Sequence, residues 1–324
     1  MAKAKKTGNA SMVNAAIRGG RSDARDALEV CARQSRRRAR AERKLAQAPA
    51  RRRAPMAAPA LPRRARGLFG TARNAGVLVA EGDSWFDYPG HDILKMLEDD
   101  HAFDVHSVAH RGDRVEDMAH GQGQFEDFAR LLEKLLRDGK MPRAILLSGG
   151  GNDIAGEEFD LLLNHAASTL PPVNDDIVRG VVDVRLRAAY ARIISGITQV
   201  AEGIIGRKIP IFTHGYARAV PDGRGFLGGF GPLPGPWLEP GFRKKGYRDL
   251  QANKAVMAGL IDRFNGMVSG ISANPQFKHV QYIDLRRLLR NDASYKQDWA
   301  NELHPTRTGF ARVTAEFAAR ISAL

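Results

Sequence analysis

The sequence predicts an α/β protein built on a mainly parallel sheet of five strands. Between residues 75 and 324, short apolar runs rich in β-branched residues alternate with longer stretches of helical periodicity. Strands that are separated by helices form βαβ units, whose strands are parallel and are covered by helices on both faces. The 324 residues and the 43% hydrophobic content are sufficient for one such core.

Each element is predicted from its own pattern. Five short apolar runs are predicted as strands, at residues 77–80, 105–109, 144–148, 209–213 and 280–284. Five amphipathic stretches are predicted as helices, at residues 92–99, 115–136, 184–205, 252–268 and 308–321. In such a sheet, ligands bind at the carboxyl ends of the strands, so the residues that follow each strand are the first candidates for function.

One long segment, residues 215–247, interrupts this alternation. It contains nine glycines and five prolines, together with Phe226, Phe230, Trp237 and Phe242. A loop of this length within a compact domain is usually functional or mobile. The aromatic residues favour a loop that covers the substrate, and a mobile excursion is the alternative.

Residues 1–70 are predicted to be a basic, Ala/Arg/Pro-rich tail that precedes an α/β domain of residues 71–324. The tail contains 19 Lys and Arg and 4 Asp and Glu, a net charge of +15, whereas the rest of the chain has a net charge of −1. With almost no aromatic or β-branched residues, it has little apolar surface to offset the entropy lost on ordering. We therefore expect it to be disordered or partly helical, with a helix over residues 22–47 that the following prolines end.

The charge of the tail suggests a partner, and the composition suggests a location. A basic arm of this kind can dock nucleic acid, an anionic membrane or another anionic partner, and a solvated leader is the alternative. The sequence contains no apolar run of transmembrane length and no recognisable secretory signal. A single cysteine, Cys31, excludes an internal disulfide. These features favour a cytoplasmic location.

Four residues with the chemistry of acyl transfer lie where the predicted topology would bring them together. Ser84 follows the first strand in a Gly-Asp-Ser tripeptide, Gly112 follows the second strand and Asn152 the third, and His304 precedes the last helix. A serine hydroxyl needs a nearby base to act as a nucleophile, and His304 is the candidate. The tetrahedral intermediate needs fixed donors about 3 Å from its oxyanion. The backbone N–H groups of Ser84 and Gly112 and the Asn152 amide are the candidate donors.

These four blocks resemble those of the GDSL/SGNH hydrolases, a flavodoxin-like family of esterases, lipases and deacetylases. The nucleophile block is at residues 82–84, the oxyanion glycine at Gly112, the Gly-x-Asn-Asp block at residues 150–153 and the terminal histidine at His304. The resemblance covers residues 75–324 and implies a three-layer sandwich. It also implies metal-independent hydrolysis of a small-molecule, glycan or lipid ester through an acyl-serine on Ser84, with no cofactor.

The terminal block departs from the family pattern, which has Asp three residues before the histidine. This chain has Asn301 there. An amide can orient the histidine but offers no negative charge, and an Asp→Asn change in a comparable triad lowers turnover about 10⁴-fold. Three arrangements stay open: Asn301 or a backbone carbonyl orients His304, a nearby acid such as Glu302 or Asp298 substitutes, or the protein is weakly active. In the last case the alternative function is a binding protein of this fold that docks through its basic tail.

Three further residues are candidates for the substrate pocket, and a purely structural role in packing or in a turn is the alternative for each. Trp85 follows Ser84, His214 follows the fourth strand, and Asp153 follows Asn152, where a carboxylate also tends to fix a local turn. No metal is expected. The acidic residues and histidine of residues 104–113 lack the further His and Asp ligands on later loops that a two-metal site needs.

Overall fold

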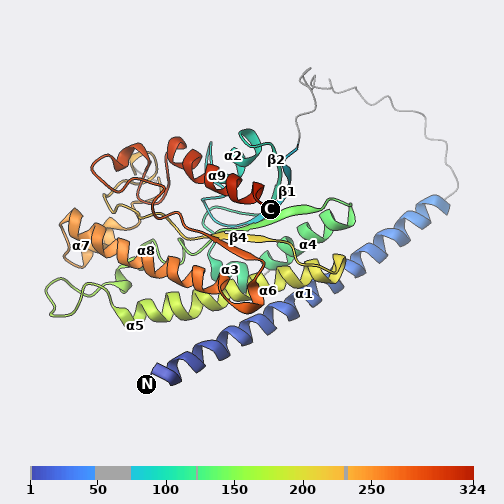
Figure 1. The fold of residues 1–324 in the computed structure, drawn as a ribbon, viewed down its shortest axis with the longest axis horizontal. Coiled ribbons are helices and arrows are strands. Elements are labelled where there is room, and N and C mark those ends of the chain that lie inside the picture. The colour runs from blue at the N-terminus through green and yellow to red at the C-terminus, as the bar shows by residue number, and fades with distance from the viewer. Residues whose placement is uncertain (1, 48–73, 122, 230–232) are drawn as a thin grey trace, which may run out of the picture.

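The sheet determines where the site lies. The computed structural model describes residues 2–47, 74–121, 123–229 and 233–324 (Figure 1). Its five strands are all parallel and follow the order β2-β1-β3-β4-β5. They are β1 (Gly76–Glu81), β2 (Phe103–Ser107), β3 (Pro142–Leu147), β4 (Ile211–His214) and β5 (Val280–Ile283). This is the flavodoxin-like strand order, so the predicted fold class is confirmed.

The strand order reverses between β1 and β3. From β1 the chain crosses to β2 at one edge of the sheet, and it then returns to β3, β4 and β5 on the other side. Loops that leave neighbouring strands in opposite directions open a crevice at their carboxyl ends. Ser84 follows β1 and Asn152 follows β3, so both residues leave the sheet at this crevice.

Helices cover both faces of the sheet. On one face, α2 (Ile93–Asp99) packs against α9 (Arg307–Ser322), which Thr306 caps by accepting the Gly309 N–H at 3.2 Å. Other helices cover the opposite face (Figure 1). They are α3 (Val115–His120), α4 (Gln124–Arg137), α6 (Arg187–Ile205) and α8 (Leu250–Ser272). The structure is therefore a three-layer sandwich.

Two helices differ from their predicted bounds. The stretch predicted as one helix at residues 115–136 forms α3 and α4, because Gly123 has a φ of 90° that interrupts the helical path. Ahead of α6, helical turns begin earlier than predicted, with α5 (Asp175–Val178) and a π-helical segment (Arg179–Leu186). The shorter helical turns are α7 (Glu239–Lys244) and the segments Glu157–Leu162, Phe226–Gly228, Pro275–Phe277 and Tyr295–Gln297.

The N-terminal segment differs most from its prediction. Residues 2–47 form one helix, α1 (Ala2–Gln47), which begins earlier than the helix expected over residues 22–47. It lies along α6 and α4, outside the layer that those helices form (Figure 1). Its buried residues recur at intervals of three and four, so they form one stripe facing α6: Ile17, Gly20, Ala24, Ala27 and Cys31. The first part of the tail, which was expected to be disordered or partly helical, therefore packs as a helix. Residues 48–70 of the predicted tail lie outside the described residues.

Small residues explain how this helix packs without bulky side chains. A Cβ atom at Gly20 would lie 2.1 Å from the Arg192 carbonyl oxygen, so the two backbones approach closely there. Beside this contact, Ser195 Oγ donates to the Ile17 carbonyl at 2.9 Å, and Arg192 pairs with Asp23 at 2.7 Å. A low content of large apolar residues did not exclude packing, because glycine and alanine allow close helix–helix contact. Among the described residues, no helix has both the length and the apolar character to cross a membrane.

Candidate active site

Ser84 lies in a turn that buried contacts hold in place. A Cβ atom at Gly82 would lie 2.7 Å from Ser148 Cβ, so the chain can leave β1 at this point only with glycine. The buried Asp83 carboxylate accepts the Trp85 N–H at 3.0 Å and the Ser148 hydroxyl at 2.8 Å. It also accepts the Tyr216 hydroxyl. The contacts of Asp83 therefore hold the turn in place, and Ser84 lies in the crevice.

His304 approaches Ser84 from the loop that precedes α9. Its Nε2 atom lies 2.7 Å from Ser84 Oγ, within hydrogen-bond distance. The imidazole stacks on the Tyr88 ring with a centroid separation of 4.4 Å, and the Trp237 ring stands edge-on to it at 5.7 Å. His304 is 6% exposed, and this burial lowers the pKa of its imidazole to about 3. The ring is thus neutral at ordinary pH and can accept a proton.

Asn301 holds the other side of the imidazole. Its side-chain oxygen lies 3.1 Å from His304 Nδ1 and accepts the backbone N–H groups of His304 at 2.9 Å and Leu303 at 3.0 Å. Its amide nitrogen donates to the Tyr88 hydroxyl at 3.1 Å, and the two backbone donors fix the oxygen as the end of the amide that faces the ring. Since an amide oxygen only accepts, His304 Nδ1 carries the proton and Nε2 is left to accept one from Ser84.

The two nearby acids have other partners. All four backbone N–H groups that Glu302 accepts lie in the segment 215–247: Gly223 at 3.0 Å, Trp237 at 2.7 Å, Leu238 at 2.8 Å and Glu239 at 3.0 Å. Asp298 pairs with Arg290 at 3.2 Å and Arg312 at 2.8 Å. Neither carboxylate is hydrogen-bonded to His304 in the described part of the chain. Of the arrangements that the sequence left open, the structure has the one in which the Asn301 side chain faces His304.

The three predicted oxyanion donors face the same space. Ser84, Gly112 and Asn152 all line one cavity together with His304. Gly112 has a φ of 92°, a conformation that favours glycine. Asn152 uses one amide N–H to donate to the Asp113 carbonyl at 2.9 Å, which leaves its second N–H for a ligand. Within the described residues, the N–H groups of Ser84 and Gly112 have no hydrogen-bond acceptor.

Of the candidate pocket residues, Trp85 lines a cavity and Asp153 has a structural role. Trp85 lines a cavity beside Ser84, and its indole N–H donates to the Leu303 carbonyl at 3.1 Å. Asp153 accepts the N–H groups of Val115 at 2.8 Å and Glu116 at 3.3 Å, so it caps α3. Burial raises the pKa of its carboxyl to about 6. Asp153 thus fixes local structure beside the site.

Of the two alternatives for His214, the structure shows packing in the core, and His214 lines neither cavity at Ser84. Its ring is fully buried, with Nδ1 donating to the Gly215 carbonyl at 2.7 Å and Nε2 lying 2.9 Å from Ser148 Oγ. It supports the floor of the site through Ser148 and Asp83, and burial lowers the pKa of the imidazole. A histidine directly after a strand is ambiguous in sequence, because β4 ends inside the core.

The segment 215–247 contributes side chains to the site. Phe226, Leu233, Pro234 and Trp237 line the cavity that contains Ser84 and His304. Phe242 instead belongs to the core, where it packs on Phe159 with ring centroids 5.2 Å apart. Phe230, the remaining aromatic residue of the predicted loop, lies outside the described residues.

Sequence reasoning missed the contribution of α8. Met257, Leu260, Ile261 and Phe264 line a second cavity that reaches Ser84. An amphipathic pattern shows only that one face of a helix is buried. It does not distinguish side chains that fill a core from side chains that border a cavity, so no signal in this helix could have identified them.

Comparison with known proteins gives structural neighbours only. No family model matches the chain, and no curated protein matches it. Similar solved structures include a putative SGNH hydrolase from Slackia heliotrinireducens, with 12% identity, 76% of this chain and 98% of that chain covered, and a TM-score of 0.42. An acetyl xylan esterase from Geobacillus stearothermophilus has 13% identity, coverages of 76% and 94%, and a TM-score of 0.39. A family 3 carbohydrate esterase from Talaromyces cellulolyticus has 10% identity, coverages of 77% and 99%, and a TM-score of 0.39.

Proposed function

We propose that this protein is a metal-independent serine hydrolase of carboxylic esters. The observation that carries the proposal is the alignment of Ser84, His304 and Asn301, with 2.7 Å from Ser84 Oγ to His304 Nε2 and 3.1 Å from His304 Nδ1 to Asn301 Oδ1. A nucleophile, its base and a group that orients the base are the parts that acyl transfer requires.

In the first half-reaction, Ser84 Oγ bonds to the acyl carbon while its proton passes to His304 Nε2. The N–H groups of Ser84 and Gly112 and the free N–H of Asn152 would bind the oxyanion that forms. The bond from the acyl carbon to the alcohol oxygen then breaks, and that oxygen takes the proton from His304. Water repeats the sequence and releases the carboxylic acid and free Ser84.

The low pKa of His304 has a consequence for rate. Because burial disfavours the imidazolium and Asn301 supplies no negative charge, the cation that forms during attack is stabilised less than in a Ser-His-Asp triad. We therefore expect turnover to be lower than in an enzyme with a carboxylate at this position.

A panel of p-nitrophenyl esters of increasing acyl length tests the proposal. Wild type should hydrolyse at least one of them, and Ser84→Ala and His304→Ala should each remove more than 99% of that rate. An active-site-directed phosphonate should label wild type but not Ser84→Ala. If hydrolysis by wild type does not exceed that by Ser84→Ala on any ester, the proposal is wrong.

A second function, binding of an anionic partner, is favoured by one observation. Arg36, Arg37, Arg38 and Arg40 are all exposed near the C-terminal end of α1, where consecutive arginines point to different sides of the helix. Such a surface suits a polyanion such as nucleic acid. Affinity for duplex DNA that falls steeply with salt, and that is lost when these four arginines become glutamine, would support it. Salt-independent binding, or binding that the substitution leaves intact, would contradict it.

A further inference from the structure

Two cavities border Ser84. Both contain Ser84, Asn152 and Leu303 in their walls, and all their other lining residues differ. The first, which we call the apolar chamber, is bordered by Ile154, Met257, Leu260 and Phe264. The second, which we call the histidine chamber, is bordered by Tyr88, Arg111, Gly112, Trp237 and His304. An ester bound at Ser84 would therefore place one half of the molecule in each chamber.

The position of His304 determines which chamber receives the acyl half of the ester and which receives the alcohol half. The departing alcohol oxygen must receive its proton from His304 Nε2, so it must lie within hydrogen-bond reach of that atom. His304 borders the histidine chamber and is not part of the wall of the apolar chamber. The alcohol half must therefore occupy the histidine chamber, and the attacking water must later enter from the same side. The acyl chain is left with the apolar chamber.

The walls of the apolar chamber suit a hydrocarbon chain. Its one ionisable carboxylate, Asp83, already accepts hydrogen bonds from the Trp85 N–H, Ser148 and Tyr216. The Tyr216 hydroxyl in turn accepts the Gly151 N–H at 3.1 Å, so this polar group also has protein partners. A polar or charged acyl group would find few free partners there, whereas each buried methylene would gain binding free energy.

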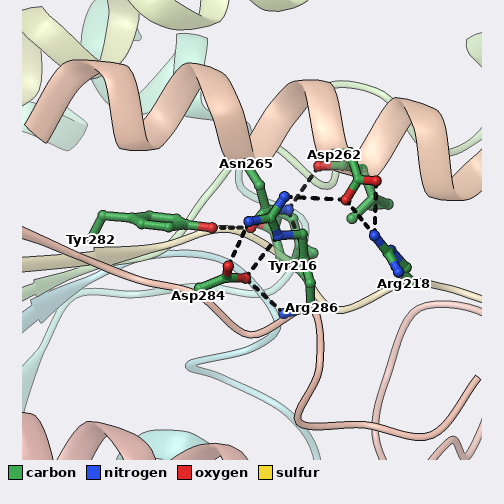
Figure 2. Close-up of polar contacts among 8 residues, drawn as sticks. Tyr216, Arg218, Asp262, Asn265, Tyr282, Asp284 and Arg286 are labelled. Atoms are coloured by element: carbon green, nitrogen blue, oxygen red, sulfur yellow. Dashed lines mark hydrogen bonds and ion pairs between the residues drawn. The ribbon is translucent and has the colours of Figure 1, made fainter. Parts of the chain in front are cut away.

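A polar network braces the wall that α8 provides (Figure 2). Asp262 of α8 accepts from Arg218 at 2.9 Å and from Arg286 at 3.3 Å. Three residues further on, Asn265 donates to the Tyr216 carbonyl at 3.1 Å and accepts from the Tyr282 hydroxyl. These contacts tie α8 to the segments that leave β4 and β5, at the level of the wall residues Ile261 and Phe264. A helix held in this way limits how far the chamber can widen.

We propose that the apolar chamber is the acyl-binding site, and that the preferred substrates are esters of unbranched, apolar carboxylic acids longer than acetic acid. This inference rests on the proposed serine hydrolase function and adds to it the orientation of the substrate. Leu260, one of the α8 residues that border the chamber, is a specificity-determining residue.

A pair of isomeric esters tests the orientation. Ethyl hexanoate and hexyl acetate have the same atoms, but the long chain is on the acyl side in the first and on the alcohol side in the second. Each methylene buried in the chamber should raise kcat/KM about fourfold. The kcat/KM of wild type, measured by pH-stat titration, should therefore be at least tenfold higher for ethyl hexanoate than for ethyl acetate.

Filling the chamber should affect the two isomers differently. Leu260→Trp should lower kcat/KM for ethyl hexanoate at least tenfold more than for hexyl acetate, and Leu260→Ala should shift the optimum toward ethyl octanoate. Ala255→Trp is the matched control, because Ala255 is exposed on the same helix and borders neither chamber. It should leave the ratio of the two rates unchanged. Thermal unfolding of each variant checks that the fold is retained.

The outcomes separate this inference from the proposed function. Hydrolysis that depends on Ser84, combined with a greater loss for hexyl acetate or an equal loss for both esters in Leu260→Trp, would overturn the acyl assignment alone. The same holds if Leu260→Trp does not fold and Leu260→Ala leaves the chain-length preference unchanged. Absence of any Ser84-dependent hydrolysis would overturn the proposed function and this inference with it.

Discussion

The side-chain oxygen of Asn301 lies 3.1 Å from His304 Nδ1, so an amide orients the imidazole that faces Ser84. The same oxygen accepts the backbone N–H groups of residues 303 and 304, which folds the turn around the ring. Orientation and charge compensation, which one carboxylate usually provides together, are thereby separated in this site. The Asn301 amide orients the imidazole but supplies no negative charge beside it.

The acid limb of the pH–rate profile should lie unusually low. In the proposed mechanism, hydrolysis requires neutral His304, and burial lowers the pKa of this imidazole to about 3. Activity should therefore persist as the pH falls below about 6.5, the usual histidine value. Measurement of kcat/KM on a p-nitrophenyl ester between about pH 4 and pH 8 checks this. A limb near 6.5 would show that the imidazole is more hydrated than its burial indicates.

Asn301→Asp should restore the missing charge. A carboxylate at this position would keep the oxygen that faces His304 Nδ1 and could accept a hydrogen bond from the Tyr88 hydroxyl. It should raise the pKa of His304, move the acid limb upward and raise kcat at pH 8 by tenfold or more. Asn301→Ala is the companion variant, and it should lower kcat about 100-fold. An unchanged limb in Asn301→Asp would mean that residue 301 is not coupled to the base.

Glu302→Gln should loosen the segment that borders the histidine chamber. The Glu302 carboxylate accepts four backbone N–H groups, and an amide can accept with only one of its two ends. We expect KM to rise about tenfold with a smaller change in kcat, and the free energy of unfolding to fall by about 2–3 kcal/mol. Glu239→Gln is the control, since it removes a side-chain charge from the same segment and keeps the backbone N–H that donates to Glu302. Equal KM values for the two variants would contradict the assignment.

Glu81→Gln should flatten the dependence of stability on pH. Glu81 is 1% exposed, and burial together with the nearby Asp113 raises the pKa of its carboxyl to about 8, from 4.5 in the unfolded chain. Below pH 4.5 both states hold the proton and Glu81 imposes no penalty. As the pH rises from 4.5 to 8, the unfolded state releases the proton and the folded state is progressively disfavoured.

The variant should therefore melt above wild type at pH 8 and close to it at pH 4.5, measured by thermal unfolding. The exposed Glu126 provides the control, because Glu126→Gln should not alter the slope of melting temperature against pH. A Glu81→Gln variant with the wild-type slope would show that the carboxyl is not protonated at neutral pH.

Gly20→Ala should weaken the packing of α1. Its added Cβ atom would lie 2.1 Å from the Arg192 carbonyl oxygen, so α1 and α6 must separate, at a cost of about 1–3 kcal/mol. At Gly19, the nearest atom to an added Cβ is the end of the flexible Arg192 side chain, at 2.3 Å. Gly19→Ala should therefore be neutral or slightly stabilising. Equal melting temperatures for the two variants would show that α1 does not pack as described.

Patterns that repeat along the chain predicted most of the fold, because β-branched runs and helical spacing depend on local residues. The packing of α1 was missed since its stripe, apart from Ile17, consists of glycine, alanine and cysteine, which add little to a hydrophobic pattern but permit close backbone contact. Ser84, Gly112, Asn152 and His304 could be predicted as candidates because each follows a strand or precedes the last helix, and all four line one cavity. The partners of Glu302 and the apolar chamber depend on contacts between distant segments, and the sequence contains no local signal for these.

Asn301 and Glu302 are consecutive residues, yet one holds the base and the other holds the segment 215–247. Two adjacent residues therefore position both the wall of the histidine chamber and His304, the proposed proton acceptor. We therefore expect that residues 215–247 cannot be exchanged for another loop without disturbing His304. A chimera that exchanged residues 215–247 for the corresponding loop of another hydrolase would leave the Glu302 carboxylate buried without donors, and the strain would be felt first at the neighbouring amide that aligns His304.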